Sequence, residues 1–308
     1  MNWLGRKGTQ QAAICIDADV IHVAQVVRVR EGLPVVSLCH SEAIEGNAGA
    51  VLQRTVNRLR LQSFQCTAVM PWQGFRLLVV EKPAVPPEEL REAVRWRLAG
   101  VLDYPPEQAV VDTVPIVIDL AGGTHASSLY AVAASSASIG ALTEQFRRSE
   151  IRLGAIDVAD LAMRNVAALF DEPGAGTALA WFHEQGSGIV FVAAGELCLV
   201  RHLEPNIAEL RQALASGDEL FLDRIELGLQ RALDHFERNF TAVPINRLLL
   251  APCAGIHELA AHLSGHLNVP AQVAELDKVL ELGSAPQLRD PQRASAMLVI
   301  LGAALRPQ

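Results

Sequence analysis

The sequence predicts an α/β fold made of two similar halves, with a small β-α-β-β-α module inserted in the first half. Residues 11–43 contain three short β-branched runs separated by turn residues, which is typical of an antiparallel meander. After DEPGAGT at 171–177, whose proline and glycines predict a linker, the same pattern starts again. We therefore expect one domain over 1–170, with the module at about 75–150, and a second over 177–308.

The first half begins with strands joined by short turns, of which Glu31-Gly32 is one. A helix follows where apolar residues recur at the helical period. The predicted elements are strands at 13–17, 20–29 and 34–39, a helix at 48–61 and a strand at 66–71.

Within the module, Pro86-Pro87 followed by two glutamates predicts a helix start, because proline is tolerated in the first turn and acids favour the positive helix end. Gly122-Gly123 predicts a hairpin turn. The predicted elements are strands at 75–83, 109–120 and 127–135 and helices at 86–101 and 137–150, followed by a helix at 157–170 capped by Asp157.

The second half opens with strands predicted at 178–184, 189–195 and 197–204. Gly186-Ser187-Gly188 falls between the first two, where a positive φ would explain the glycines. A continuous apolar stripe at 220–240 predicts a long helix. Strands at 247–252 and 271–276 and helices at 255–267 and 293–305 complete the half, and the last helix is expected to pack back on the first domain.

Composition narrows the function classes. The chain has 308 residues, of which 50% are hydrophobic and 19% charged, and its formal net charge is −8. This charge disfavours general nucleic-acid binding, which needs a basic face. No apolar run approaches the roughly 18 residues that span a bilayer, and residues 1–10 lack a signal-peptide core. We expect a cytoplasmic protein, to which the basic start around Arg6-Lys7 adds at most a weak membrane contact.

The histidines of HELAAHLSGHL do not form a zinc-protease motif, because His262 lies five residues after His257 rather than four. His262 and His266 are correctly spaced for a metal, but no third ligand is evident, and the sequence favours surface histidines. No phosphate-binding P-loop and no G-x-S-x-G elbow occur. Asp157 and Asp160 could face a cleft, although capping explains Asp157.

Three aromatic residues lie in or beside the module, namely Trp72, Phe75 and Trp96. Aromatic side chains anchor protein interfaces, so the group could mark a binding groove for a partner. The same residues could equally form the core of the module.

Several stretches, in this order along the chain, resemble the PilM family of type IV pilus assembly proteins and its MSHA-pilus relative MshI, within the actin-like superfamily. The stretches are ICIDADVIHVAQVV, EKPAVPPEELREAVRWRLAGVLDYPPEQAVVD, GAIDVADLAMRNVAAL, RIELGLQRALDHFE, LLLAPCAGIHELAAHLSGHLNVP and ASAMLVILGAAL. The resemblance implies a two-domain actin-like fold. In this family the inserted module corresponds to subdomain 1C, which is shared with the cell-division protein FtsA.

The resemblance also implies three ATP-binding loops, and here each departs from the family pattern. The first, Asp-x-Gly in the family, keeps Asp17 but has Asp19 in place of the glycine, which puts a negative charge near the phosphates. The second loop, Asp-Ile-Gly in the family, falls on the strand LAWFH at 179–183, which lacks both the acid and the glycine. The third loop, at 251–255, keeps one glycine. We expect a degenerate nucleotide site at Asp17, Ala254 and Gly255, with Pro252 removing a backbone donor.

The resemblance therefore implies a non-catalytic assembly protein on the cytoplasmic face of the inner membrane, in a type IV or MSHA-like pilus platform. Its expected partner is the cytoplasmic tail of a PilN- or MshJ-like bitopic protein, which in this family docks near the first domain and the module. One alternative is a PilM-like ATPase that binds ATP and Mg²⁺ and hydrolyses ATP slowly, and another is a GspL-like cytoplasmic domain of type II secretion. A sugar- or acetate-kinase-like enzyme would need intact loops. Homo-oligomerisation stays open.

Overall fold

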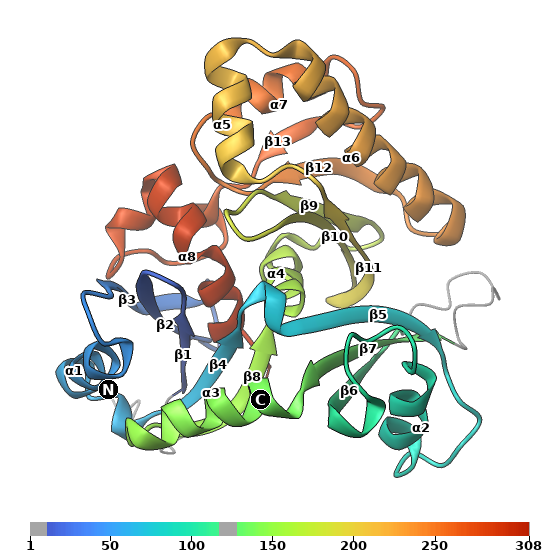
Figure 1. The fold of residues 1–308 in the computed structure, drawn as a ribbon. Helices are drawn as coiled ribbons and strands as arrows, with labels where there is room; N and C mark the ends of the chain where they lie inside the picture. Colours follow the sequence, from blue (N-terminus) through green and yellow to red (C-terminus); the bar gives the residue numbers. More distant parts are fainter. Residues whose placement is uncertain (1–10, 117–127, 308) are drawn as a thin grey trace.

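The structure is a computed structural model that describes residues 11–116 and 128–307. Two five-stranded sheets form its centre, and a three-stranded sheet lies beside them (Figure 1). The strands are β1 Gln11–Ile16, β2 Val20–Val27, β3 Val35–Ala43, β4 Gln65–Met70, β5 Phe75–Glu81, β6 Ala109–Pro115, β7 Ser128–Ser135, β8 Arg152–Val158, β9 Gly176–Trp181, β10 Ser187–Ala193, β11 Glu196–Leu203, β12 Ile245–Leu250 and β13 Ala271–Val273. The α-helices are α1 Ala48–Leu59, α2 Leu90–Arg97, α3 Ser136–Arg148, α4 Ala159–Ala167, α5 Ile207–Ser216, α6 Glu219–Asn239, α7 Ile256–Ser264 and α8 Pro291–Ala304.

The two large sheets share one topology. The first has the order β3-β2-β1-β4-β8 and the second the order β11-β10-β9-β12-β13. In each, three antiparallel strands are followed by two strands parallel to the first of them. A helix ends each unit, α4 after β8 and α8 after β13. The second half of the chain therefore repeats the strand plan of the first.

Strand β8 was not predicted from the sequence, and the cap assigned to Asp157 is wrong. Asp157 lies within β8, and its carboxylate accepts a hydrogen bond from the amide of Val158 at 2.9 Å. Helix α4 starts two residues later and has no side-chain cap. Its N-terminus directly follows the buried last two residues of the parallel strand β8, so tertiary packing rather than a capping residue fixes where it begins.

The terminal helices are exchanged between the sheets. Helix α4 packs against β9, β10 and β11 of the second sheet, whereas α8 packs against β1, β2 and β4 of the first (Figure 1). The two helices cross closely at Gly302, where an added Cβ would lie 2.1 Å from the carbonyl oxygen of Ala162. Asn165 Nδ2 donates to the Gly302 carbonyl oxygen at 3.0 Å. The crossing ties the two halves together.

The small sheet has the order β5-β7-β6 and is covered by α2. Tyr130 on β7 attaches it to the second sheet: its hydroxyl donates to the Cys198 carbonyl oxygen at 3.3 Å and accepts from the Val200 amide at 3.1 Å. In this sheet β5 is an edge strand, paired only with β7 among the described strands.

Two sequence predictions lie outside the described residues, namely the turn at Gly122-Gly123 and the basic start around Arg6-Lys7. Within the described residues, no helix combines the length and the apolar character needed to cross a membrane.

Candidate functional site

The cleft between the two large sheets is closed by direct contacts around Asp17. The Asp17 carboxylate accepts a hydrogen bond from Gln185 Nε2, which comes from the β9–β10 hairpin of the other half. It also accepts from the Ala18 amide at 2.7 Å. Asp19 is exposed in the same turn, where its backbone carbonyl accepts from the Ile44 amide at 2.8 Å. The carboxylate of the first loop is thus hydrogen-bonded to other residues of the protein. The sequence analysis did not identify Gln185 as its partner.

Two tryptophans fill the cleft beside Asp17. Trp72, which follows β4, stacks on Trp181 of β9 with ring centroids 6.0 Å apart and an interplanar angle of 26°. The space left around Asp17, His22 and Trp72 is about 30 Å³, and that around Trp181 and Pro252 about 10 Å³. Ligand sites typically measure about 300–1,000 Å³, so both of these spaces are far smaller than a usual ligand site.

Gly186 and Gly188 allow the two tryptophan rings to pack closely. The positive φ predicted for these glycines is wrong. A Cβ on Gly186 would lie 3.2 Å from the Trp72 ring, and one on Gly188 would lie 2.7 Å from the Trp181 ring. Neither glycine has a positive φ, and Gly188 lies inside β10. Close approach of the two rings therefore explains both residues.

The described residues that line this space offer no positive charge to a phosphate. Burial lowers the pKa of His22 and of His183, against the opposing effect of the Asp17 carboxylate. Both imidazoles are therefore neutral at pH 7. No lysine or arginine lines this space in the described part of the chain. A triphosphate would meet a carboxylate here and no counter-charge.

The third loop is covered by helix α5. Gly255 has φ +78°, and a Cβ there would lie 2.5 Å from Leu214 Cδ1 of α5. Pro252 and Cys253 are buried, and Ala254 is half-buried. Glycine is required at position 255 by both its backbone angle and its contact with α5, and so it serves the entry into α7.

An ion pair joins the halves beside the cleft. His202 Nε2 on β11 lies 3.0 Å from Asp160 Oδ1 on α4, and the Asp160 side chain is fully buried. This hydrogen bond, more than the opposing burial, raises the pKa of His202. The sequence suggested Asp160 as a cleft residue, and the structure gives it a partner from the other half.

Stability conferred by this pair should depend on pH. Because the folded-state pKa of His202 is raised, its contribution is present below the ordinary histidine pKa of about 6.5 and is lost as pH rises through the raised value. We expect His202→Gln to lower the free energy of unfolding by up to about 1 kcal/mol at pH 5.5, since the side chain is 55% exposed, and by less at pH 9. Urea unfolding of both proteins at the two pH values measures this difference; an equal or larger loss at pH 9 would contradict it.

The three aromatics predicted as one group are separated. Trp72 and Phe75 have ring centroids 6.2 Å apart, and both line a groove of about 520 Å³ along β5. Trp96 on α2 is 49% exposed, donates to Glu92 Oε1 at 2.8 Å and does not line this groove. Trp96 therefore lies apart from the other two, whereas Trp72 and Phe75 share both a hydrophobic cluster and a groove wall.

A third potential metal ligand comes from α6, which the sequence did not reveal. Donor atoms of Glu226, His262 and His266 lie within 4.8 Å of one another. His262 Nε2 is 3.6 Å from the Glu226 carboxylate, and His266 Nδ1 lies 2.8 Å from the His262 carbonyl oxygen. These three groups could supply ligands to a divalent cation, and they also link α6 to α7 as ion pairs when the histidines are protonated.

No protein-family model and no curated protein matches the chain by sequence. Among solved structures, a PilM–PilN type IV pilus biogenesis complex matches with a TM-score of 0.70 and 16% identity, covering 97% of this chain and 99% of that one. A protein of Bacteroides thetaiotaomicron, described as having an actin-like ATPase fold and unknown function, matches with a TM-score of 0.52 and 10% identity, covering 94% and 95%.

The chain has the actin-like fold. The predicted fold class is thus confirmed. Another structure with this likeness is the cytoplasmic domain of EpsL, an inner membrane component of the type II secretion system of Vibrio cholerae. Its TM-score is 0.51 at 10% identity, with 97% of this chain and 96% of that chain covered. At these identities the likeness establishes the actin-like architecture, and the roles of the cleft and the grooves rest on their own geometry.

Proposed function

We propose that this protein is a non-catalytic assembly component of a type IV pilus platform, MSHA-like in kind, that binds the cytoplasmic tail of a PilN- or MshJ-like membrane protein. It would act at the cytoplasmic face of the inner membrane. The observation that carries the proposal is an open groove along an edge strand, directly beside a closed nucleotide cleft. The likeness to a PilM–PilN complex supports the choice of partner.

The groove follows the edge of β5 rather than one of its faces. Four consecutive residues, Phe75 to Leu78, line it, and successive side chains of a strand point to opposite faces. The far wall is formed by residues of the β9–β10 hairpin and by His202 and Leu203 at the end of β11. An extended peptide could add to the free edge of β5 through main-chain hydrogen bonds, with apolar side chains seated against Trp72 and Leu77. An N-terminal cytoplasmic tail is the kind of segment that binds in this way.

Nucleotide turnover does not fit this arrangement. The Trp72–Trp181 stack and the Asp17–Gln185 hydrogen bond occupy the space between the halves. We infer that contacts within the protein have replaced the bound nucleotide in holding the halves together. Asp17, Ala254 and Gly255 would then be remnants of an ATP site, and Mg²⁺ would have no role in it.

A tail-binding variant tests the proposal. Leu77→Arg should weaken binding of a labelled peptide of the PilN-like tail by at least about tenfold, because it removes an apolar anchor and places a charge in the groove. Val79→Arg is the matched control: Val79 is on the same strand and 56% exposed, but does not line the groove. Fluorescence anisotropy measures both affinities.

The same binding assay should also use peptides of the cytoplasmic tails of type II secretion components, because the EpsL cytoplasmic domain shares the fold. If a secretion tail binds in the groove and the pilus tails do not, the protein belongs to a secretion platform. Equal binding to the wild type and Leu77→Arg would rule out the β5 groove as the docking site.

A further inference from the structure

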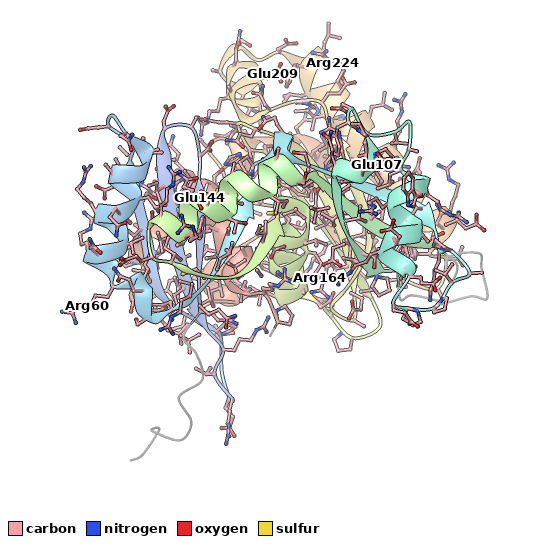
Figure 2. The ribbon with its side chains drawn as sticks, turned by 60° about the horizontal axis from the view of Figure 1, so that its bottom comes forward. Arg60, Glu107, Glu144, Arg164, Glu209 and Arg224 are labelled. Carbon is pink, nitrogen blue, oxygen red and sulfur yellow. The ribbon has the colours of Figure 1, made fainter. Side chains whose placement is uncertain are left out.

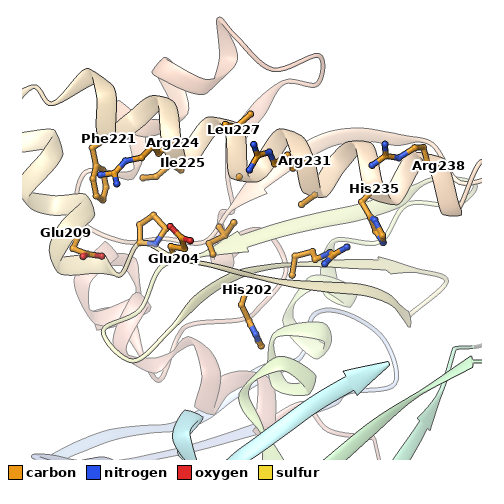
Figure 3. Close-up of a pocket in the computed structure, with 15 residues that line it drawn as sticks. His202, Glu204, Glu209, Phe221, Arg224, Ile225, Leu227, Arg231, His235 and Arg238 are labelled. Atoms are coloured by element: carbon orange, nitrogen blue, oxygen red, sulfur yellow. The ribbon is translucent and has the colours of Figure 1, made fainter. Parts of the chain in front are cut away.

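A second and larger groove, of about 810 Å³, lies between helix α6 and strand β11 (Figure 3). Arg224, Arg231 and Arg238 line it from α6, and Arg201 lines it from β11. Figure 3 shows the three α6 arginines following one another along the helix above the strand. All four are exposed. The groove meets the tail-binding groove at His202 and Leu203, which line both.

None of these four arginine side chains forms an ion pair or hydrogen bond with another described residue; the Arg224 guanidinium only stacks on the Phe221 ring, 4.9 Å from its centroid. Several arginines outside the groove pair with carboxylates, as Arg58 does with Glu42 and Arg164 with Glu196, whereas the unpaired ones outside it, such as Arg54, do not line this groove. The chain as a whole carries a net charge of −8. A groove that gathers unpaired arginines on an acidic protein is a complementary surface for an anionic ligand.

The spacing of the arginines selects the form of that ligand. Arg224, Arg231 and Arg238 are separated by seven residues each, which places them on one helix face about 10.5 Å apart. An extended chain in the polyproline II conformation has three residues per turn and advances about 3.1 Å per residue, so every third side chain lies on the same face, about 9.3 Å from the last. Carboxylates at every third position of such a segment would therefore face Arg231 and Arg238 in succession. A single nucleotide is too short to reach all three.

The two ends of the groove differ in charge. Glu204 and Glu209 lie at the end that holds Phe221 and Arg224, and Figure 2 likewise shows Glu209 and Arg224 at one end of the molecule (Figures 2 and 3). Leu227, 49% exposed, lies between the first two arginines in sequence. The Phe221–Leu227 end therefore suits an apolar residue, and the Arg231–Arg238 end suits carboxylates. The two glutamates also disfavour a nucleic-acid backbone, which is uniformly negative.

We propose that the groove between α6 and β11 binds an extended acidic segment of a partner protein, with its carboxylates on Arg231, Arg238 and Arg201 and an apolar residue near Leu227. This site adjoins the tail groove on β5 and shares His202 and Leu203 with it. Because the two grooves are contiguous, a tail and an acidic segment could be held side by side on one molecule.

The probe is a fluorescein-labelled peptide of about 12 residues with glutamate at every third position, compared with its glutamine counterpart. The full chain should bind the glutamate peptide, more weakly as salt rises, and should not bind the glutamine peptide. Arg231→Glu combined with Arg238→Glu should weaken binding at least about tenfold. Arg54→Glu, an exposed and unpaired arginine on α1, is the matched control and should change binding less than about twofold.

Arg231→Gln with Arg238→Gln removes the charge without reversing it, and a melting curve for each variant separates loss of binding from loss of folding. Equal binding of the glutamate peptide to the wild type and to both double variants would overturn the proposal. Tighter binding of a single-stranded DNA oligonucleotide, or of phosphatidylglycerol vesicles, through the same arginines would overturn it as well. Failure of the tail peptides on β5 would leave this result unaffected, because the two experiments use different variants.

Discussion

Replacing Gly302 by alanine should lower the free energy of unfolding by about 3 kcal/mol or more, which is a large share of the stability of an ordinary domain. The new Cβ would lie 2.1 Å from the carbonyl oxygen of Ala162, which is backbone of α4 and cannot turn aside as a side chain can. The helices would have to separate, and α8 is the helix that packs against β1, β2 and β4 of the other half. Urea denaturation followed by circular dichroism measures the loss.

Gly140→Ala is the control for this substitution. Gly140 is exposed within α3, and nothing lies within 4 Å of the Cβ it would acquire. Alanine there should raise the free energy of unfolding by about 0.5–1 kcal/mol, because glycine is the poorer helix former. A loss at Gly302 no larger than the change at Gly140 would contradict the close crossing of α4 and α8.

Replacing Trp181 by alanine should cost about 3–5 kcal/mol, since Trp181 is 2% exposed and its removal leaves a cavity between the halves. Trp181→Phe should cost much less, because it keeps a ring against Trp72 and removes an indole N–H that has no hydrogen-bond partner among the described residues. The same urea titration measures both.

Trp96→Ala supplies the matched control for the tryptophan deletion. Trp96 is 49% exposed and loses one hydrogen bond to Glu92, so the expected cost is below about 1 kcal/mol. A loss at Trp181 no larger than that at Trp96 would mean that the Trp72–Trp181 stack does not hold the cleft closed.

The fold class could be predicted because the strong signals are local. The opening meander and its repetition after residue 177 follow from runs of β-branched residues and turn residues. Strand β8 was missed because RLGAIDV is half-buried and lies directly before a helix, so its pattern merges with that of α4. The exchange of α4 and α8 between sheets depends on a helix crossing that no single segment specifies.

The closed cleft was only partly predictable. The replacement of a loop glycine by Asp19 and the bulky LAWFH strand indicated an eroded site. The two contacts that close the cleft, Trp72 with Trp181 and Gln185 with Asp17, each join residues from different halves that meet only in the folded chain. The seven-residue spacing of Arg224, Arg231 and Arg238 was visible in the sequence, but the opposite wall with Arg201 was not.

The central claim is that contacts between the halves have replaced the nucleotide, and thermal unfolding with and without Mg-ATP tests it most directly. A ligand present at about 100 times its dissociation constant stabilises a protein by about 2.7 kcal/mol, so even modest affinity would raise the melting temperature at millimolar Mg-ATP. We predict that the wild type and Asp17→Ala each show no change in melting temperature when Mg-ATP is added. A saturable rise in the wild type that is absent in Asp17→Ala would contradict the account.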